Sequence, residues 1–296
     1  MTDTLLTRAE PMTAPGRLFV DAAREAATRI APRAMAADAA GVMNEENFRD
    51  LTDLGITSAF VPSELGGFGL SSIHDWALGI AELATADASV AIAINMHLGV
   101  TRGLAASVGR GAGNPFVEGM LSAVAAGEML ICATATEPGT DNLHPLTEAV
   151  AAGDDTHVLN GAKTFVTMSP VATHLALVLR VRDEGDQAAS TLLPIDTPGI
   201  EPQDDWDALG MRASGSQSVR FNDVAVPSAA LTRIGEWGRW NPSWLMNRAL
   251  GNVSLLGASL GIAEAAYAAV LAGTDRQPRT GVPLRERPGG RGSAAR

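Results

Sequence analysis

Hydrophobic periodicity changes twice along this chain of 296 residues, and the order of the changes limits its fold. Residues from about 17 to 126 repeat apolar side chains at helical spacing, whereas residues 130–227 form short strand-like runs. Helical spacing returns past Arg239. Because no helices separate the strand-like runs, they favour a β-barrel or sandwich over a doubly wound sheet. The sequence therefore predicts an α+β fold with an N-terminal helical domain (1–127), a middle β-domain (128–235), the start of a C-terminal helical bundle (236–284) and a disordered or aberrant tail (285–296).

Capping residues mark where the N-terminal helices begin. Asn44 is followed by two glutamates and is predicted to cap a helix that runs to Leu54. Ser71 or Ser72 is predicted to cap the next helix. Residues 88–108 are apolar on all sides, which is typical of a buried helix.

The strand-like region contains an expected hairpin and an expected tight turn. Residues 149–159 resemble two short strands joined by a polar turn, and Asn160-Gly161 is the dipeptide favoured in type I′ hairpin turns. Further strands are expected at 174–181, 190–195 and 218–226.

The long apolar stripe from Leu245 to Val270 predicts a helix in the C-terminal region. Small residues follow a second stripe beside it, at Gly251, Ser254, Ala258 and Gly261. Such a stripe permits close approach of another helix or of a cofactor, and helix packing is the commoner cause.

Composition excludes several classes of protein. The net charge is -11 and basic residues do not cluster before the extreme C-terminus, so the chain is not expected to bind nucleic acid. The single cysteine, Cys132, lies in an apolar run and is interpreted as a buried structural thiol. No uninterrupted run of about 18 apolar residues is visible, and residues 1–20 lack a signal-peptide core. A cytoplasmic protein without membrane contact is therefore expected.

Common catalytic motifs are missing from the sequence. Gly109–Gly113 lacks the spacing of a dinucleotide-binding loop, and Gly161-Ala-Lys-Thr164 lacks the first glycine of a phosphate loop. The histidines show no metal-ligand spacing, so no metal site is predicted. No G-x-S-x-G elbow supports serine hydrolase chemistry.

The stretch Thr136–Asn142, TEPGTDN, gathers hydroxyls, carboxylates, a proline and a glycine where a strand should end. These residue types are typical of an ordinary surface turn. A loop on a rigid scaffold is also a common place for a ligand site. Both interpretations can hold together.

Five segments, in order, resemble the acyl-CoA dehydrogenase family. They are Val61–Ser71 (VPSELGGFGLS), Glu82–Ser89 (ELATADAS), Thr136–Asn142 (TEPGTDN), Leu159–Thr167 (LNGAKTFVT) and Leu209–Ser214 (LGMRAS), which runs on to Val226-Pro227. TEPGTDN is about two residues shorter than the corresponding family loop. The resemblance implies a helical domain, a small β-domain and a helical bundle, with FAD as cofactor.

The resemblance also assigns residues to the flavin. Ala135 and Thr136 would lie along the pyrimidine edge of the flavin. Phe165 would pack against the isoalloxazine ring, although ordinary strand core is an equal alternative, and Thr167 would supply a hydroxyl nearby. The other assigned residues are Arg276 or Arg279, which would meet the flavin of a neighbouring subunit, and Thr140 and Asp141, which would approach the substrate.

Further residues have an open or structural role under the resemblance. Arg212 is either an anion contact or part of a salt bridge, and Glu137 is interpreted as structural. Most family members carry the catalytic carboxylate in a later part of the bundle that is not recognisable here, and some carry it on the first bundle helix, where this chain has Gly251, so the sequence names no base. The resemblance ends near Leu284, which suggests a truncated or frame-shifted member.

The implied activity is α,β-dehydrogenation of an acyl thioester, carried by CoA or by an acyl-carrier protein. The implied electron acceptor is an electron-transfer flavoprotein or oxygen, and a completed bundle would imply a homo-oligomer. A related flavin-dependent monooxygenase needs no α-proton base and is the alternative. A non-catalytic remnant without flavin is the third possibility.

Overall fold

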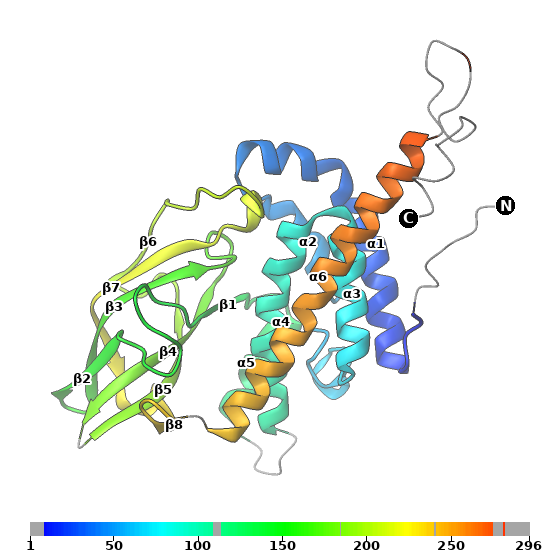
Figure 1. The fold of residues 1–296 in the computed structure, drawn as a ribbon. Coiled ribbons are helices and arrows are strands. Elements are labelled where there is room, and N and C mark those ends of the chain that lie inside the picture. Colours follow the sequence, from blue (N-terminus) through cyan, green and yellow to red (C-terminus); the bar gives the residue numbers. More distant parts are fainter. Residues whose placement is uncertain (1–8, 109–113, 184, 240, 275–280, 282–296) are drawn as a thin grey trace.

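The computed structural model describes residues 9–108, 114–183, 185–239, 241–274 and 281. Helices form one side of the molecule and a sheet forms the other (Figure 1). The expected order of N-terminal helices, middle sheet and C-terminal helix is confirmed. The predicted tail at 285–296 lies outside the described residues.

Five α-helices form the described N-terminal region, and two of them begin at capping residues that the sequence predicts. They are α1 (Ala14–Ala40), α2 (Glu45–Asp53), α3 (Ile73–Ala86), α4 (Ala88–Val108) and α5 (Pro115–Ala125), with a short 3-10 turn, η1 (Ser63–Leu65), before α3. The Asn44 side chain accepts a hydrogen bond from the Glu46 amide, which confirms this residue as the cap of α2. Ser72, rather than Ser71, caps α3 by accepting from the Asp75 amide.

Asp75 joins the start of α3 to the start of α1. Its carboxylate accepts hydrogen bonds from the Met12 amide (2.8 Å), the Thr13 amide (3.0 Å) and the Thr13 hydroxyl (2.7 Å). Burial raises the pKa of Asp75, but the hydrogen bonds from Met12, Thr13 and His74 outweigh it and lower the pKa to about 2. The ionised carboxylate therefore stabilises the contact between the two helices.

We expect Asp75→Asn to lower the free energy of unfolding by about 2 kcal/mol at pH 7. A carboxyl with a depressed native pKa stabilises the fold above its unfolded pKa of 3.8, and this contribution is lost as the pH falls towards about 2. The difference between wild type and variant should therefore shrink from pH 4 to pH 2 in urea titrations. A difference that stays constant over this range would contradict the assignment.

Eight strands form a single hydrogen-bonded sheet in the middle region. Their order is β6-β7-β3-β2-β4-β5-β8, and β1 pairs with β4 off this path. One edge of β4 pairs with β5, while the other edge pairs first with β1 and then with β2. The strands are β1 (Ile131–Thr134), β2 (Glu148–Gly153), β3 (Thr156–Val166), β4 (His174–Asp183), β5 (Gly185–Pro194), β6 (Ile200–Pro202), β7 (Gln217–Pro227) and β8 (Thr232–Glu236), with short turns η2 (Arg212–Ser214) and η3 (Ser228–Ala230).

The predicted hairpin between β2 and β3 is confirmed, but the predicted turn at Asn160-Gly161 is wrong. Strand β3 continues through both residues, and its register with β7 shifts between Leu159 and Gly161. Gly161 has a φ of 145°, and a Cβ there would lie 2.6 Å from the Thr147 hydroxyl. The dipeptide therefore forms a β-bulge, which needs the same backbone freedom as the turn.

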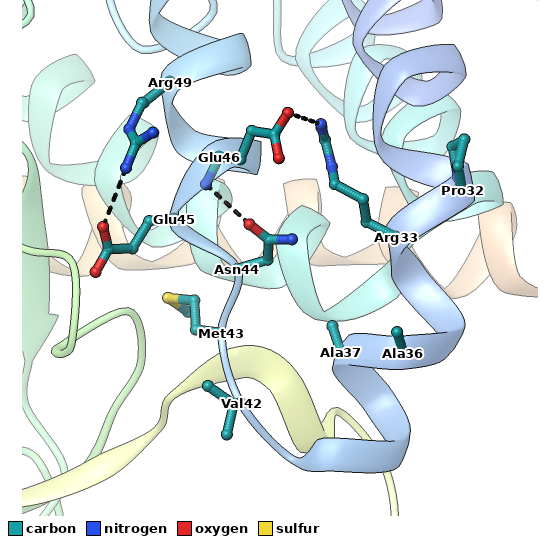
Figure 2. Close-up of a pocket in the computed structure, with 10 residues that line it drawn as sticks. All are labelled: Pro32, Arg33, Ala36, Ala37, Val42, Met43, Asn44, Glu45, Glu46 and Arg49. Atoms are coloured by element: carbon teal, nitrogen blue, oxygen red, sulfur yellow. Dashed lines mark hydrogen bonds and ion pairs between the residues drawn. The ribbon is translucent and has the colours of Figure 1, made fainter.

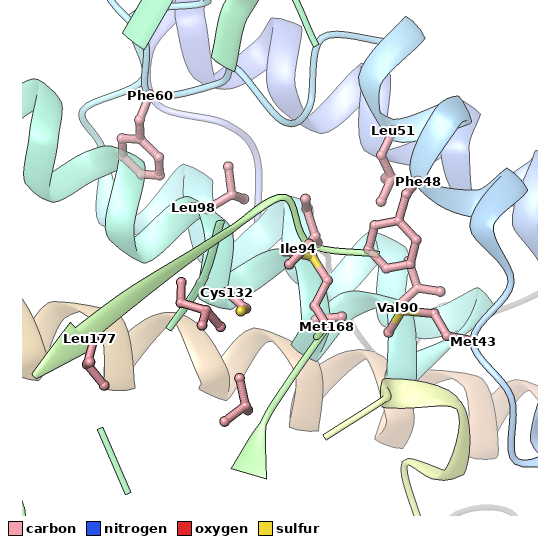
Figure 3. Close-up of a cluster of buried hydrophobic side chains, with 14 of the residues drawn as sticks. Met43, Phe48, Leu51, Phe60, Val90, Ile94, Leu98, Cys132, Met168 and Leu177 are labelled. Atoms are coloured by element: carbon pink, nitrogen blue, oxygen red, sulfur yellow. The ribbon is translucent and has the colours of Figure 1, made fainter. Parts of the chain in front are cut away.

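Buried side chains of the described residues form two clusters, and the larger one joins the helices to the sheet. Figure 3 shows Phe48 of α2, Ile94 of α4 and Leu177 of β4 in this cluster. Cys132 belongs to it with no exposed surface, and burial raises the pKa of its thiol to about 12, which confirms a structural thiol. His97 links the two parts directly, with Nε2 at 2.9 Å from the Thr57 carbonyl and Nδ1 accepting from the Ile131 amide at 3.0 Å.

Helix α6 (Pro242–Thr274) packs one face on α3 at very short range. A Cβ at Gly257 would lie 2.2 Å from the Ala77 carbonyl oxygen, and a Cβ at Gly261 would lie 2.2 Å from that of Ala81. Helix packing therefore explains part of the small-residue stripe. The sequence pattern identified the stripe but not which helix it meets.

The other face of α6 carries exposed apolar side chains, including Leu256 and Val270. Within the described residues, α6 is the helix long and apolar enough to cross a membrane, although one such helix is weak grounds for a membrane. No membrane-spanning segment was expected from the sequence, because it contains no uninterrupted run of about 18 apolar residues. Glycine and serine interrupt the run in α6, but the helix as a whole remains apolar.

Candidate functional site

The loop that follows β1 is attached to β3 and to α6. The Thr164 amide donates to the Thr136 carbonyl at 3.0 Å. In the amide orientation that satisfies its neighbours, Asn142 donates to the Ala135 carbonyl at 2.8 Å and accepts from Arg248 at 3.1 Å. The main-chain carbonyls of Ala135 and Thr136, the two residues predicted for the flavin edge, are thus each held by a hydrogen bond. Thr136 itself is exposed at the surface of this loop.

A buried ion pair fixes the base of the same loop. Glu137 is 3% exposed and Lys163 of β3 is 0% exposed, and the Lys163 ammonium lies 2.5 Å from a Glu137 carboxylate oxygen. Glu137 also accepts from the amides of Leu146 (2.6 Å) and Thr147 (3.1 Å). Burial lowers the pKa of Lys163, and the Glu137 charge opposes that shift. The structural interpretation of Glu137 is confirmed.

Thr140 and Asp141 make their hydrogen bonds within the loop. The Thr140 hydroxyl donates to the His144 carbonyl at 2.7 Å. Asp141 accepts from the amides of Leu143 and His144 and lies 2.9 Å from the His144 ring, which lowers the pKa of Asp141. Trp237 then packs edge-on against the His144 ring, with centroids 4.7 Å apart. Thr140 and Asp141 therefore shape the loop, and their contact with substrate stays a prediction.

Phe165 is an exposed aromatic residue in a strained backbone conformation. Its side chain is 56% exposed and its φ is 55°, in the left-handed region that bulky residues avoid. Its ring meets Trp206 edge-on at 5.9 Å, and the Trp206 indole donates to the Met211 carbonyl at 3.1 Å. The alternative of ordinary strand core is wrong for Phe165. The positive φ turns the ring out of the core side of β3, where it can meet a planar ligand.

Thr167 begins a chain of buried hydroxyls behind Phe165. Its hydroxyl lies 2.9 Å from the Ser216 hydroxyl, which lies 2.7 Å from that of Ser214. The Thr167 amide donates to the Phe165 carbonyl at 2.9 Å. This network fixes the backbone beside the strained residue.

A cavity of about 310 Å³ opens beside this loop. It lies against residues next to Glu137 and Phe165, and it is lined by Pro138, Ala162, Lys163, Thr164, Gln203, Asp205, Ser218 and Arg220. The predicted flavin residues Ala135, Thr136, Phe165 and Thr167 are not among the residues that line this cavity, and their contact with flavin stays a prediction.

Two arginines on the helical side, of which Arg248 contacts this loop, were missed by the sequence analysis. Arg102 of α4 donates to the Asn247 side chain of α6 at 2.8 Å, and the next residue, Arg248, binds Asn142. Burial lowers the pKa of both arginines. Single arginines on apolar helices carry no sequence signal, because their neighbours are set only by helix packing.

Of the two roles considered for Arg212 from the sequence, the structure shows the salt bridge, to the exposed Asp207, and adds two contacts with main-chain carbonyls. Its guanidinium donates to the Asp38 carbonyl at the end of α1 (2.9 Å) and to the Ala208 carbonyl (3.1 Å). The nearest carboxylate, Asp207, is 3.8 Å away and almost fully exposed. Arg212 therefore caps a helix C-terminus and joins the helices to the sheet.

The remaining site predictions concern arginines and metal ligands. Arg276 and Arg279 lie outside the described residues. Within the described ranges, no group of three or more His, Cys, Asp or Glu side chains is placed to hold a metal ion.

A larger hollow of about 680 Å³ lies between α1 and α2, away from this loop (Figure 2). Its charged side chains are paired with each other, Arg33 with Glu46 at 2.8 Å and Arg49 with Glu45 at 3.3 Å. Such paired charges are typical of a solvated surface.

Comparison with known proteins agrees with this architecture. Residues 13–111 match the N-terminal domain model of acyl-CoA dehydrogenases, and residues 131–224 match the middle domain model. The fold and these matches define a flavin-dependent oxidoreductase scaffold. The chain belongs to the acyl-CoA dehydrogenase family.

Similar curated proteins fall into two groups. L-evernosamine nitrososynthase of Micromonospora sp. is 35% identical over 282 residues, covering 92% of this chain and 65% of that protein. Amino sugar nitrososynthase DnmZ of Streptomyces peucetius is 31% identical over 278 residues, covering 93% and 67%. The short-chain specific acyl-CoA dehydrogenase of Megasphaera elsdenii is 29% identical, covering 86% and 67%. The chain thus spans about two thirds of the length of these relatives.

Solved structures that share this fold include a nitrososynthase and KijD3. The nitrososynthase of Micromonospora carbonacea var. africana superposes with a TM-score of 0.85 at 32% identity, covering 96% of this chain and 71% of that one. KijD3 in complex with FMN and dTDP-3-amino-2,3,6-trideoxy-4-keto-3-methyl-D-glucose superposes with a TM-score of 0.84 at 32% identity, covering 91% and 66%.

Proposed function

We propose that this chain is a flavin-dependent N-oxygenase that acts on the amino group of a nucleotide-linked amino sugar. This choice corrects the order of the sequence expectations, in which acyl thioester dehydrogenation came first. Dehydrogenation is supported only at the level of the family, whereas the relatives that are 31–35% identical over 86–93% of this chain are amino sugar nitrososynthases. The monooxygenase alternative is therefore preferred.

The observation that carries the proposal is the 31–35% identity to amino sugar nitrososynthases, and the open space at Gly251 accords with it. An α,β-dehydrogenase of this family needs a carboxylate to remove the α-proton, and α6 is one of the helices that can carry it. A Cβ added at Gly251 would meet no atom within 4 Å, so the space for a longer side chain exists but holds none. The only acidic residue of α6 is Glu264, roughly 20 Å further along the helix at 1.5 Å per residue. An N-oxygenation needs no such base.

Two features of the described residues, Phe165 and the Thr136 loop, fit a flavin. Phe165 presents an exposed aromatic face beside a polar cavity, and its unfavourable φ is of the kind found at ligand sites. The Thr136 loop is fixed by its bond to Thr164 and by the Glu137–Lys163 pair, so donors and acceptors along a flavin edge would be pre-positioned. The choice between FAD and FMN is part of the test.

A bound reduced flavin would activate oxygen, so that one oxygen atom goes to the amine nitrogen and the other leaves as water. The protein's share is to hold the sugar amine near the ring, to exclude water and to keep the amine unprotonated. Phe165 and the fixed loop would orient the ring. The electron donor is then a reductase or free reduced flavin, with oxygen as the co-substrate.

We expect Phe165→Gly to weaken flavin binding at least about tenfold without lowering the melting temperature of the flavin-free protein. Glycine adopts a φ of 55° without steric strain, so the loss of an exposed ring should cost the fold little. Fluorescence titration with FMN and with FAD measures the binding. Phe116→Ala removes another exposed ring, on α5, and should leave it unchanged.

Product analysis tests the proposed function. The purified chain is incubated with flavin, a flavin reductase, NADH and oxygen, together with a dTDP-linked 3-amino sugar or with butyryl-CoA. We expect a mass gain of oxygen on the amino sugar and no change in butyryl-CoA. Formation of an enoyl-CoA under oxygen-free conditions with an electron acceptor would instead identify a dehydrogenase. Mass spectrometry of the released cofactor identifies FAD or FMN.

A further inference from the structure

The α4 helix contains a buried polar side chain without a partner. Asn95 is 1% exposed, and neither its amide nitrogen nor its amide oxygen has a hydrogen-bond partner among the described residues. The Nε atom of Arg102 is buried and unpartnered in the same way. Buried polar groups are normally hydrogen-bonded, because an unpaired one reduces stability. Both groups therefore have unused hydrogen-bonding capacity.

The two unpartnered groups lie on one face of α4. They are separated by seven residues, which is about two helical turns, or roughly 10 Å along the axis. Arg102 presents this face to α6, where its guanidinium donates to the Asn247 side chain at 2.8 Å. Asn95 therefore points towards the seam between α4 and α6, and Figure 1 shows α6 crossing α4.

Open space accompanies this face. Gly99 lies between the two groups, and a Cβ there would meet only the Trp76 ring, at 3.9 Å. Cβ atoms at Gly103 of α4 and Gly251 of α6 would meet no atom within 4 Å. Glycine at Gly99 leaves room between the two polar groups, unlike Gly257 and Gly261, where a Cβ would collide with α3.

The seam is connected to the loop that carries the predicted flavin edge. Arg248 follows Asn247 on α6 and binds the Asn142 side chain, which donates to the Ala135 carbonyl at 2.8 Å. One run of contacts therefore leads from Arg102 through α6 to Ala135. A ligand group in the seam would lie next to that loop.

We propose that Asn95 and Arg102 form a specificity subsite for the hydroxyl and keto oxygens of the substrate's sugar ring. The inference rests on the proposed function and names the part of the chain that recognises the sugar. An amide both donates and accepts, which suits a hydroxyl, and the Nε–H of an arginine donates to a keto or hydroxyl oxygen. A hydrocarbon acyl chain would leave all three atoms unpaired.

Asn95→Leu tests the subsite, because leucine has a similar shape and no polar atoms. We expect the melting temperature without ligand to rise by about 2–4 °C, since a costly unpaired amide is removed. We expect affinity for dTDP-3-amino-2,3,6-trideoxy-4-keto-3-methyl-D-glucose to fall about 10- to 100-fold, while affinity for dTDP stays the same. Calorimetry on the FMN-loaded chain measures the affinities for the sugar nucleotide and for dTDP. Thr101→Val on the same helix, whose hydroxyl bonds the His97 carbonyl at 2.7 Å, should leave both affinities unchanged.

The outcomes separate the subsite from the proposed function. Unchanged sugar-nucleotide affinity in Asn95→Leu, or a lower melting temperature, would overturn the subsite even if the wild type oxygenates the amine. Asn95-dependent binding without any oxygenated product would support the subsite and overturn the function. A wild-type chain that binds no sugar nucleotide would overturn both.

Discussion

Gly257→Ala is expected to lower the free energy of unfolding by about 3 kcal/mol or more, and the melting temperature by roughly 5–10 °C. The new methyl group would lie 2.2 Å from the Ala77 carbonyl oxygen, which belongs to the α3 backbone and cannot rotate away. The two helices would have to separate along their whole contact. Gly261→Ala should act in the same way, because its Cβ would lie 2.2 Å from the Ala81 carbonyl oxygen.

Gly119→Ala is the matched control for helix propensity. Gly119 lies in α5, and a Cβ there would meet no atom within 4 Å. This change should raise stability by a few tenths to about 1 kcal/mol, because alanine favours a helix more than glycine does. Thermal unfolding of the three variants compares close packing with propensity. A Gly257→Ala variant that melts with the wild type would show that α6 does not pack against α3 at this distance.

Glu137→Ala is expected to cost about 3–5 kcal/mol and to abolish flavin binding. It leaves the fully buried Lys163 ammonium without its partner and frees the amides of Leu146 and Thr147. Lys163→Met should cost less, because the Glu137 carboxylate keeps both amides as donors. Urea unfolding and flavin titration of each variant measure the order.

The double variant Glu137→Gln with Lys163→Met separates the charge from the loop geometry. Glutamine can still accept from the Leu146 and Thr147 amides, and methionine fills the lysine's volume without charge. We expect it to be more stable than Glu137→Ala and to recover part of the flavin binding. Equal losses in all three variants would indicate that the ion pair has no separate role in holding the loop.

Local chemistry explains why the helix starts and strand runs were predictable. Asn44 and Ser72 cap helices because their side chains accept from amides two or three residues away, and such contacts depend on neighbours in sequence. The bulge at Asn160-Gly161 shows the limit of this reasoning. The same dipeptide suits a turn or a bulge, and only pairing with β7 selects the bulge.

Part of the candidate site was likewise predictable from the sequence, and part of it was not. The segment resemblance identified Ala135, Thr136, Phe165 and Thr167, and the structure joins their two segments through the bond from the Thr164 amide to the Thr136 carbonyl. The resemblance gave no indication that Phe165 has a positive φ or that Arg212 caps α1. These features depend on contacts between residues far apart in the chain.

The sequence by itself determined the order of helices and strands, several helix caps and the family, because these follow from periodicity and from local residue types. Only the tertiary structure decided which polar groups are paired. Lys163 finds Glu137 at 2.5 Å, whereas Asn95, equally buried, finds no partner among the described residues. The physical reason is that the electrostatics of a buried group depend on the atoms that packing places around it, and residue order alone does not specify them.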